Sequence, residues 1–228
     1  MSCAPPSPNF GERRGGARPE LVVIHYTAMP SFGSARTRLC LPEAEVSAHW
    51  LIGSDGQAEQ LVPEEMRAWH AGAGQWRGCD DVNSRSIGIE LDNLGERPFP
   101  EPQMAALEDV LGGIMARWAI PPENIIGHSD MSPGRKIDPG SRFDWQRLAR
   151  QGLSIWPEVR GAVPPDGDTF CALAQSFGYG DLGIETLLPA FRLRFRPRHE
   201  GPLDSTDMAL IADLALRFGD DGGAWRAS

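Results

Sequence analysis

Three short apolar segments of buried-strand length each carry, near the carboxyl end, a side chain that can bind a metal ion or move a proton. The segments span residues 21–26, 86–92 and 123–128. Continuous aliphatic and β-branched runs of this kind are typical of strands buried on both faces. The side chains are His25, Glu90 and His128. Because open α/β sheets usually bind ligands at the carboxyl ends of their strands, we expect these three side chains to converge at one edge.

Apolar spacing predicts the elements around these strands. Residues 46–52 and 57–62 flank a Gly-Ser-Asp-Gly turn and are expected to form two paired strands. A long helix is expected over residues 102–118, because apolar residues recur there every three or four positions until a Pro-Pro pair stops them. Asp144 is expected to cap a further helix. Strands that alternate with helices in this way indicate the α/β fold class.

The chain divides into a main domain and a smaller C-terminal module. Residues 1–20 are rich in Pro, Gly and Arg and are expected to lie over the surface as an extended arm, and residues 21–157 form the main domain. Residues 158–168 are expected to be an exposed linker. Residues 169–228 contain three apolar patterns at helical spacing and no strand pattern, which predicts a small three-helix module.

Charge and hydropathy argue against two classes of partner. The 228 residues carry a formal net charge of −9, which opposes binding to nucleic acid or to an anionic lipid surface. No segment approaches the roughly 18–20 consecutive apolar residues of a membrane span. We therefore expect no nucleic acid and no membrane as partner, and the sequence leaves the oligomeric state open. Four arginines at alternate positions, 192 to 198, are expected to spread over a solvated helix surface.

The N-terminus and the cysteines bear on the location of the protein. The first residues contain no basic segment followed by an apolar one, as a secretory signal would. Cys3, Cys40, Cys79 and Cys171 are scattered and form no Cys-x-x-Cys pair, which suits reduced thiols. These features predict a cytoplasmic protein.

Lysine is almost absent from the chain. Lys and Arg together number 22, and Lys136 is the one lysine, so the other 21 are arginine. Arginine therefore serves wherever any positive charge is enough. The single lysine suggests that position 136 needs the compact charge of an ammonium group rather than the planar guanidinium of arginine. It lies two residues before Asp138, in the Gly/Pro-rich loop that follows His128.

His25, His128 and Asp138 form a candidate metal site. Two imidazoles and one carboxylate leave the fourth position of a tetrahedral zinc ion open, as catalytic zinc sites do, although several divalent ions suit the same donors. The alternative is that both histidines are buried core residues and that Asp138 is a turn residue before proline.

Six sequence strings, taken together and in order, resemble the zinc-dependent N-acetylmuramoyl-L-alanine amidases of the type-2, AmpD-like family, which share their fold with peptidoglycan recognition proteins. The strings are Val23–Thr27, Val46–Ile52, Ala68–Gly72, Ser86–Glu90, Gly127–Asp130 and Pro133–Gly140. The resemblance covers about residues 10–157 and implies a central mixed sheet flanked by helices. Residues 165–228 resemble, more weakly, a three-helix peptidoglycan-binding module.

The resemblance also implies roles for the residues singled out above. It implies that His25, His128 and Asp138 bind Zn²⁺. Glu90 is implied as the general acid or base, and Lys136 as the group that stabilises the transition state. Each role agrees with the chemistry of the side chain: a carboxylate can carry the proton from water to the leaving amine, and an ammonium group can offset charge on the carbonyl oxygen.

Substrate-binding residues are expected in the strings that line the cleft of the family. His49, Trp69 and His70 are expected to contact sugar or peptide. For His49 and His70, orientation of a metal ligand or a purely structural role remains an alternative. Asn83 and Arg85 are expected, from their position, to help bind a carboxylate of the peptide stem.

The implied reaction is hydrolysis of the amide between the lactyl group of N-acetylmuramic acid and L-alanine. For a cytoplasmic enzyme the expected substrates are 1,6-anhydro-muropeptides released during peptidoglycan recycling. The C-terminal module favours an exported enzyme that acts on the intact wall, unless it serves as a packing element or as a clamp on the muropeptide. A receptor without catalytic activity is a third alternative, because some peptidoglycan recognition proteins keep the fold and lose the metal.

Overall fold

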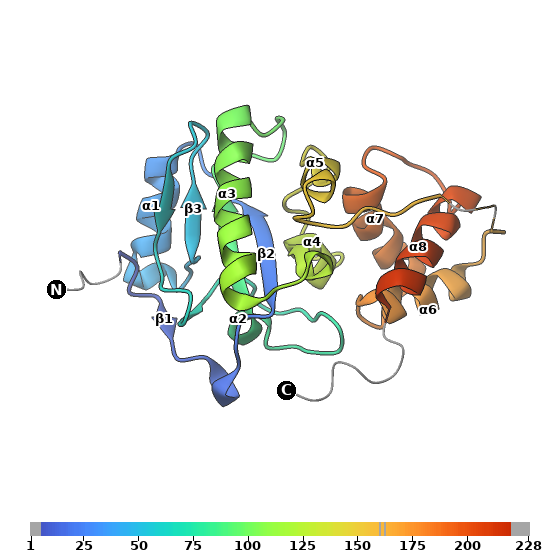
Figure 1. Ribbon diagram of the computed structural model, residues 1–228, viewed down its shortest axis with the longest axis horizontal. Helices are drawn as coiled ribbons and strands as arrows, with labels where there is room; N and C mark the ends of the chain where they lie inside the picture. The colour runs from blue at the N-terminus through green and yellow to red at the C-terminus, as the bar shows by residue number, and fades with distance from the viewer. Residues whose placement is uncertain (1–5, 160, 162, 220–228) are drawn as a thin grey trace.

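A five-stranded mixed sheet forms the centre of the computed structural model, which describes residues 6–159, 161 and 163–219 (Figure 1). The strand order is β4-β3-β6-β2-β7. The strands are β2 (Leu21–Tyr26), β3 (Trp50–Ile52), β4 (Ala58–Gln60), β6 (Ser86–Leu91) and β7 (Ile125–Gly127). Strands β3, β6, β2 and β7 run parallel, and β4 is antiparallel to β3. The predicted α/β class and mixed sheet are confirmed.

Helices cover the sheet; α1, α2 and α3 lie between its strands in the chain, and the others follow β7. In the main domain they are α1 (Phe32–Cys40), α2 (Val82–Arg85), α3 (Glu101–Trp118), α4 (His128–Met131) and α5 (Trp145–Arg150), with 3₁₀ turns at Arg14–Gly16, Pro42–Ala44 and Pro122–Asn124. The C-terminal helices are α6 (Gly167–Phe177), α7 (Ile184–Phe195) and α8 (Ser205–Phe218). The long predicted helix is α3, and Asp144 caps α5 by accepting a hydrogen bond from the amide of Arg147 at 3.0 Å.

Helix α1 was not predicted, and its composition explains why. Only Ala35 and Leu39 of its nine residues are buried, so the helix has no apolar stripe that a periodicity argument would detect. Its start is set locally by Ser31 and Ser34, whose side chains each cap the other's backbone amide.

The register of the parallel strands brings the predicted side chains together. Strand β2 pairs with β6 so that His25 lies opposite Glu90. On its other side β2 pairs with β7 so that Ile24 lies opposite Gly127, and His128 follows as the first residue of α4. Because parallel strands end at the same edge, all three side chains reach one place, as their positions in the sequence predicted.

The two faces of the sheet are covered by different parts of the chain. Val22 and Ile24 of β2 belong to the hydrophobic cluster that includes α3. Leu21 and Val23 belong, together with Ile126 of β7, to a cluster that continues into the C-terminal helices. The C-terminal module, drawn in orange and red in Figure 1, therefore shares a hydrophobic core with the main domain.

The N-terminal arm is also attached to the sheet domain. Strand β1 (Phe10–Gly11) pairs with β5 (Arg67–Ala68) as a second, two-stranded sheet. The guanidinium of Arg13 donates to the carbonyls of Ser84 and Glu64 at 2.8 and 2.7 Å. Of the predicted segments, residues 1–5 of the arm, 160 and 162 of the linker and 220–228 of the module lie outside the described residues. Within the described ranges, no helix combines the length and apolarity of a membrane span.

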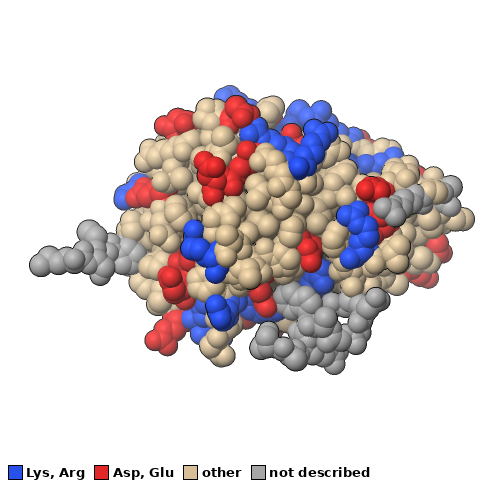
Figure 2. Space-filling view, in the orientation of Figure 1, with Lys and Arg blue, Asp and Glu red and all other residues tan. Residues whose placement is uncertain are grey.

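The expectation that the arginines from 192 to 198 lie on a solvated surface is wrong for two of them. Basic and acidic side chains are interspersed over the face shown in Figure 2, yet Arg192 and Arg194 are only 6% and 1% exposed. Arg192 pairs with Asp207, and Arg194 pairs with Asp130. A guanidinium can be buried where it pairs with a carboxylate. The spacing of the arginines in the sequence does not reveal such a partner.

Candidate active site

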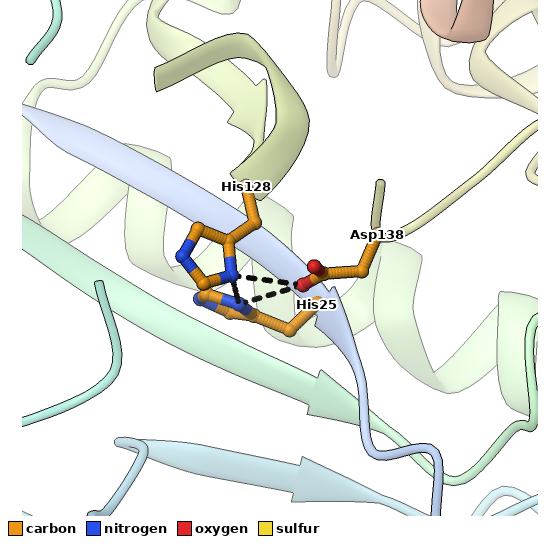
Figure 3. A group of neighbouring side chains, drawn as sticks. All are labelled: His25, His128 and Asp138. Carbon is orange, nitrogen blue, oxygen red and sulfur yellow. Dashed lines mark hydrogen bonds and ion pairs between the residues drawn. The ribbon is translucent and has the colours of Figure 1, made fainter. Parts of the chain in front are cut away.

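Three potential metal ligands meet at the carboxyl edge of the sheet (Figure 3). His25 comes from β2, His128 from the start of α4, and Asp138 from the loop that follows α4. The Nδ1 atoms of the two histidines lie 2.9 Å apart, and each lies 3.0 Å from Oδ2 of Asp138. All three residues are buried.

A chain of hydrogen bonds sets the tautomer of His25. The hydroxyl of Ser86 donates to the carbonyl of Val82 at 2.6 Å, so its oxygen accepts from Nε2 of His70 at 3.2 Å. Nδ1 of His70 then carries no proton and accepts from Nε2 of His25 at 3.0 Å. Nδ1 of His25 is left with a lone pair that points at the other two ligands.

His128 is set in the same tautomer by a single contact. Its Nε2 donates to the carbonyl of Ala71 at 2.9 Å, which leaves a lone pair on Nδ1. A tetrahedral ion with bonds of about 2.0–2.2 Å holds its ligand atoms roughly 3.3 Å apart, close to the spacing of the three atoms here. Two lone pairs and a carboxylate oxygen that face one point fit a divalent cation such as Zn²⁺.

The charges of these groups also suit metal binding. Burial and the neighbouring His128 lower the pKa of His25 to about 4, so the imidazole is neutral. Burial alone would raise the pKa of Asp138, but hydrogen bonds from His128 and His25 outweigh it and hold the pKa below the ordinary value. Neutral imidazoles and an ionised carboxylate are the forms that coordinate metal ions.

Glu90 lies beside the three candidate ligands, and its pKa is shifted in the opposite direction from those of His25 and Asp138. Burial, with the nearby charge of Asp138, raises the pKa of Glu90 to about 8, and Lys136 opposes that rise. Its Oε2 atom is buried and has no hydrogen-bond partner among the described residues. A carboxyl group in this state can take up or release a proton near neutral pH.

A cavity of about 600 Å³ opens over the candidate ligands, within the size range of small-molecule sites. It is lined by the ligands, Glu90 and Lys136 together with Tyr26, Thr27, Ala28, Met29, Ala35, Arg38, Leu39, Val46, Ser47, Trp69, His70, Arg135 and Ile137. Trp69 and His70, which the sequence analysis expects to contact the substrate, both belong to this lining. Both ring nitrogens of His70 already have partners in the protein, His25 and Ser86.

Three other predicted substrate-binding residues are not in the cavity lining. The ring of His49 is fully buried; it accepts from the amide of Gly88 at 2.9 Å and donates to the carbonyl of Met66 at 3.0 Å. Oδ1 of Asn83 accepts from the amides of His70 and Ala71 and so supports the loop that carries the histidine. Arg85 forms an ion pair with Glu20.

Two arginines of the cavity were missed by the sequence analysis. Arg38 comes from α1, the helix that the apolar pattern did not reveal. Arg135 precedes the lysine already singled out, and its guanidinium donates to the carbonyl of Ala71 at 3.0 Å and to the hydroxyl of Ser132 at 2.6 Å. The only sequence feature that could have pointed to Arg135 as a cavity residue was its position in the Pro133–Gly140 string.

A buried His₂Asp group next to an acid/base carboxyl and a lysine, at the carboxyl edge of an α/β sheet, is the donor set of a metal-assisted hydrolase. Residues 15–141 match the family described as N-acetylmuramoyl-L-alanine amidase. The chain belongs to this family, and the predicted class of enzyme is thereby confirmed.

Individual relatives differ in how much of the chain they match. The N-acetylmuramoyl-L-alanine amidase AmiD of Escherichia coli is 35% identical, over 90% of this chain and 85% of that protein. The 1,6-anhydro-N-acetylmuramyl-L-alanine amidase AmpD of Haemophilus influenzae is 37% identical, over 62% of this chain and 86% of AmpD. The match to AmiD therefore extends into the C-terminal module.

Solved structures confirm the fold. AmiD of E. coli, in complex with anhydro-N-acetylmuramic acid-L-Ala-D-γ-Glu-L-Lys, superposes with a TM-score of 0.82 at 34% identity, over 93% of this chain and 99% of that one. AmpDh3 of Pseudomonas aeruginosa, in complex with anhydromuramic pentapeptide, gives a TM-score of 0.81 at 30% identity, over 91% and 95% of the two chains.

The hydrogen-bond chain through His70 predicts a measurable effect on metal binding. Replacing His70 with Phe keeps an aromatic ring but removes the acceptor that orients His25. We expect the affinity for Zn²⁺ to fall about 10- to 100-fold, the usual effect of losing a partner of a metal-bound histidine. Competition with a chromophoric chelator measures it, with Glu59→Gln, at a surface residue paired with Arg36, as the control. An unchanged affinity in the His70 variant would show that the chain of hydrogen bonds does not orient the ligand.

Proposed function

We propose that this protein is a zinc-dependent amidase that cleaves the bond between the lactyl group of N-acetylmuramic acid and L-alanine in muropeptides, with 1,6-anhydro-muropeptides as substrates. The observation that carries the proposal is the convergence of His25, His128 and Asp138 with Glu90 and Lys136 on one cavity. The anhydromuropeptides bound in the structures of AmiD and AmpDh3 support this choice of substrate.

His25, His128 and Asp138 would hold the metal through the Nδ1 atoms of the histidines and Oδ2 of the aspartate. The chemistry that zinc supplies in such sites is Lewis-acid activation of water and of a carbonyl group. The protein's own part is to orient the imidazoles, through His70 and Ala71, and to keep that of His25 neutral by burial.

Glu90 would act as the proton carrier of the reaction. Its carboxylate takes a proton from the attacking water and gives it to the nitrogen of L-alanine as the amide bond breaks, because the amine must leave protonated. The raised pKa, near 8, makes both steps accessible around neutral pH. Its Oε2 atom, which has no hydrogen-bond partner among the described residues, would be the one to take up the proton.

Lys136 would stabilise the negative charge that develops on the scissile carbonyl oxygen. Its side chain lines the cavity. Its positive charge limits the rise in the pKa of Glu90 and contributes to the lowering of the pKa of His25. A donor placed in this way contributes about 3–4 kcal/mol to the transition state. The flat indole of Trp69, also in the lining, is suited to pack against the sugar ring.

For the location we propose the cytoplasm. Cys40 and Cys171 carry free thiols, which suits a reducing compartment. A second candidate function, cleavage of the intact wall by an exported enzyme, is favoured by the C-terminal module, which the match to AmiD includes.

Substrate assays distinguish the two candidates. Purified protein is incubated with 1,6-anhydro-N-acetylmuramyl-tripeptide or with intact sacculi, with and without a chelator, and the products are identified by mass spectrometry. We expect release of free tripeptide from the soluble fragment, abolished by the chelator and restored by Zn²⁺. Cleavage of sacculi would favour the wall hydrolase, and inactivity of zinc-loaded protein on both substrates would favour a binding protein.

Substitutions at Glu90 and Lys136 test the assigned roles. Glu90→Gln removes the proton carrier and should lower kcat about 10²- to 10⁴-fold. Lys136→Met removes the stabilising charge and should lower kcat about 10²- to 10³-fold. Both variants should still bind one equivalent of zinc, which metal analysis checks. Glu59→Gln, at a surface residue paired with Arg36, serves as the control with normal kcat.

Cell fractionation tests the location. We expect the protein, detected with an antibody, in the cytoplasmic fraction beside a cytoplasmic marker enzyme. Recovery with the cell envelope or the periplasm would instead support the exported wall hydrolase.

A further inference from the structure

A buried carboxylate lies two residues after the candidate ligand His128. Asp130 is completely buried, and its two oxygens accept three hydrogen bonds. Oδ2 accepts from the amide of Gly127 at 2.8 Å and from Nη1 of Arg194 at 2.9 Å, and Oδ1 accepts from the hydroxyl of Tyr179 at 2.7 Å. Gly127 immediately precedes the candidate ligand, whereas Arg194 and Tyr179 belong to the C-terminal module.

Arg194 reaches the end of the central sheet as well as Asp130. Its Nη2 atom donates to the carbonyl of Ile125, the first residue of β7, at 2.8 Å. Its guanidinium lies 4.5 Å from the ring of Trp145, in α5. One side chain of α7 therefore contacts the strand that leads into α4, the carboxylate within α4 and the helix that follows.

Helix α4 depends on such outside contacts because it is a single turn of four residues, too short to be stable by itself. Its position also matters for a second ligand. The amide of Ser129 donates to the carbonyl of Asp138 at 2.9 Å, so α4 and the loop that carries Asp138 are joined directly. Two of the three candidate ligands are thus placed by this one turn.

The C-terminal module also holds the loop that follows His70. Trp76 is 1% exposed and packs edge-to-face against Phe177 and Tyr179, with ring centroids 5.6 and 5.2 Å apart. The backbone amide of Arg77 donates to the carbonyl of Gly178 at 2.8 Å. The segment of His128 and the loop that follows His70 are therefore both anchored on α6 and α7 and on the turn between them.

We propose that the C-terminal module is a positioning element of the metal site, and that Arg194, through Asp130, holds α4 so that His128 and Asp138 keep their ligating geometry. The inference rests on the proposed zinc site. A module joined only by a flexible linker would have no need of a fully buried ion pair in its interface, since burying two charges is costly unless both are well partnered. Here the pair joins the C-terminal module to Ile125, Gly127 and Asp130, which lie within three residues of the candidate ligand His128.

Helix α7 provides a matched control. Arg192 is also buried, at 6% exposed against 1% for Arg194, and it too pairs with a buried carboxylate, Asp207. Its hydrogen bonds to Gly201, Pro202 and Asp207 all lie within the C-terminal module. Arg192→Met and Arg194→Met therefore remove the same group from the same helix, and only the second breaks the contact with the turn that carries His128.

The test measures the dissociation constant for Zn²⁺ of the full chain by chelator competition, with circular dichroism to verify folding. We expect Arg194→Met to raise the constant about 10-fold or more, and Arg192→Met to leave it within about 2-fold of the unsubstituted protein. Equal constants in the two variants would overturn the proposal, because the effect would then not depend on the contact with α4.

Tyr179→Phe keeps the proposal testable if loss of either arginine prevents folding. It removes one hydrogen bond to Asp130 and should raise the zinc dissociation constant about 3-fold, whereas an unchanged constant would contradict the proposal. Failure of the unsubstituted protein to bind zinc would refute the proposed zinc site itself, and with it this inference. Zinc binding that is insensitive to Arg194 and Tyr179 would refute the positioning role alone.

Discussion

The parallel pairing of β2 with β6 and β7 is the constraint on which the rest of the site depends. It sets His25 opposite Glu90 and brings the end of β7 level with Ile24, one residue before His128. Successive side chains of a strand point to opposite faces, so a register shift of one residue would send His25 away from its partners. The apolar residues of β2, which pack on both faces, hold this register.

Orientation of the imidazoles depends on hydrogen bonds to groups that are not themselves candidate metal ligands. His25 is oriented through His70 and Ser86, and His128 through the carbonyl of Ala71. Gly88 leaves space for the ring of His70, because a Cβ atom at position 88 would lie 2.4 Å from that ring. The loop that carries His70 and Ala71 therefore contributes to both ligands at once.

The C-terminal module contacts the main domain both through apolar packing and through a buried ion pair. Its helices close one face of the sheet, and its buried arginine meets Asp130 next to the candidate metal site. The match to AmiD covers 90% of this chain and the match to AmpD covers 62% of it, while the family match ends at residue 141, before the module begins. In this protein the C-terminal module shares a hydrophobic core with the main domain.

The sequence alone determined the fold class, the main strands, the long helix and the three C-terminal helices, because local apolar periodicity reports which residues are buried. It also singled out His25, Glu90, His128, Lys136 and Asp138, which stand at strand ends or in a distinctive loop and which the structure brings to one cavity. Helix α1 with Arg38, the burial of Arg194, and the positions of His49, Asn83 and Arg85 outside the cavity were decided by tertiary structure. Each of these depends on a partner distant in the chain, and no local pattern records where such a partner will lie.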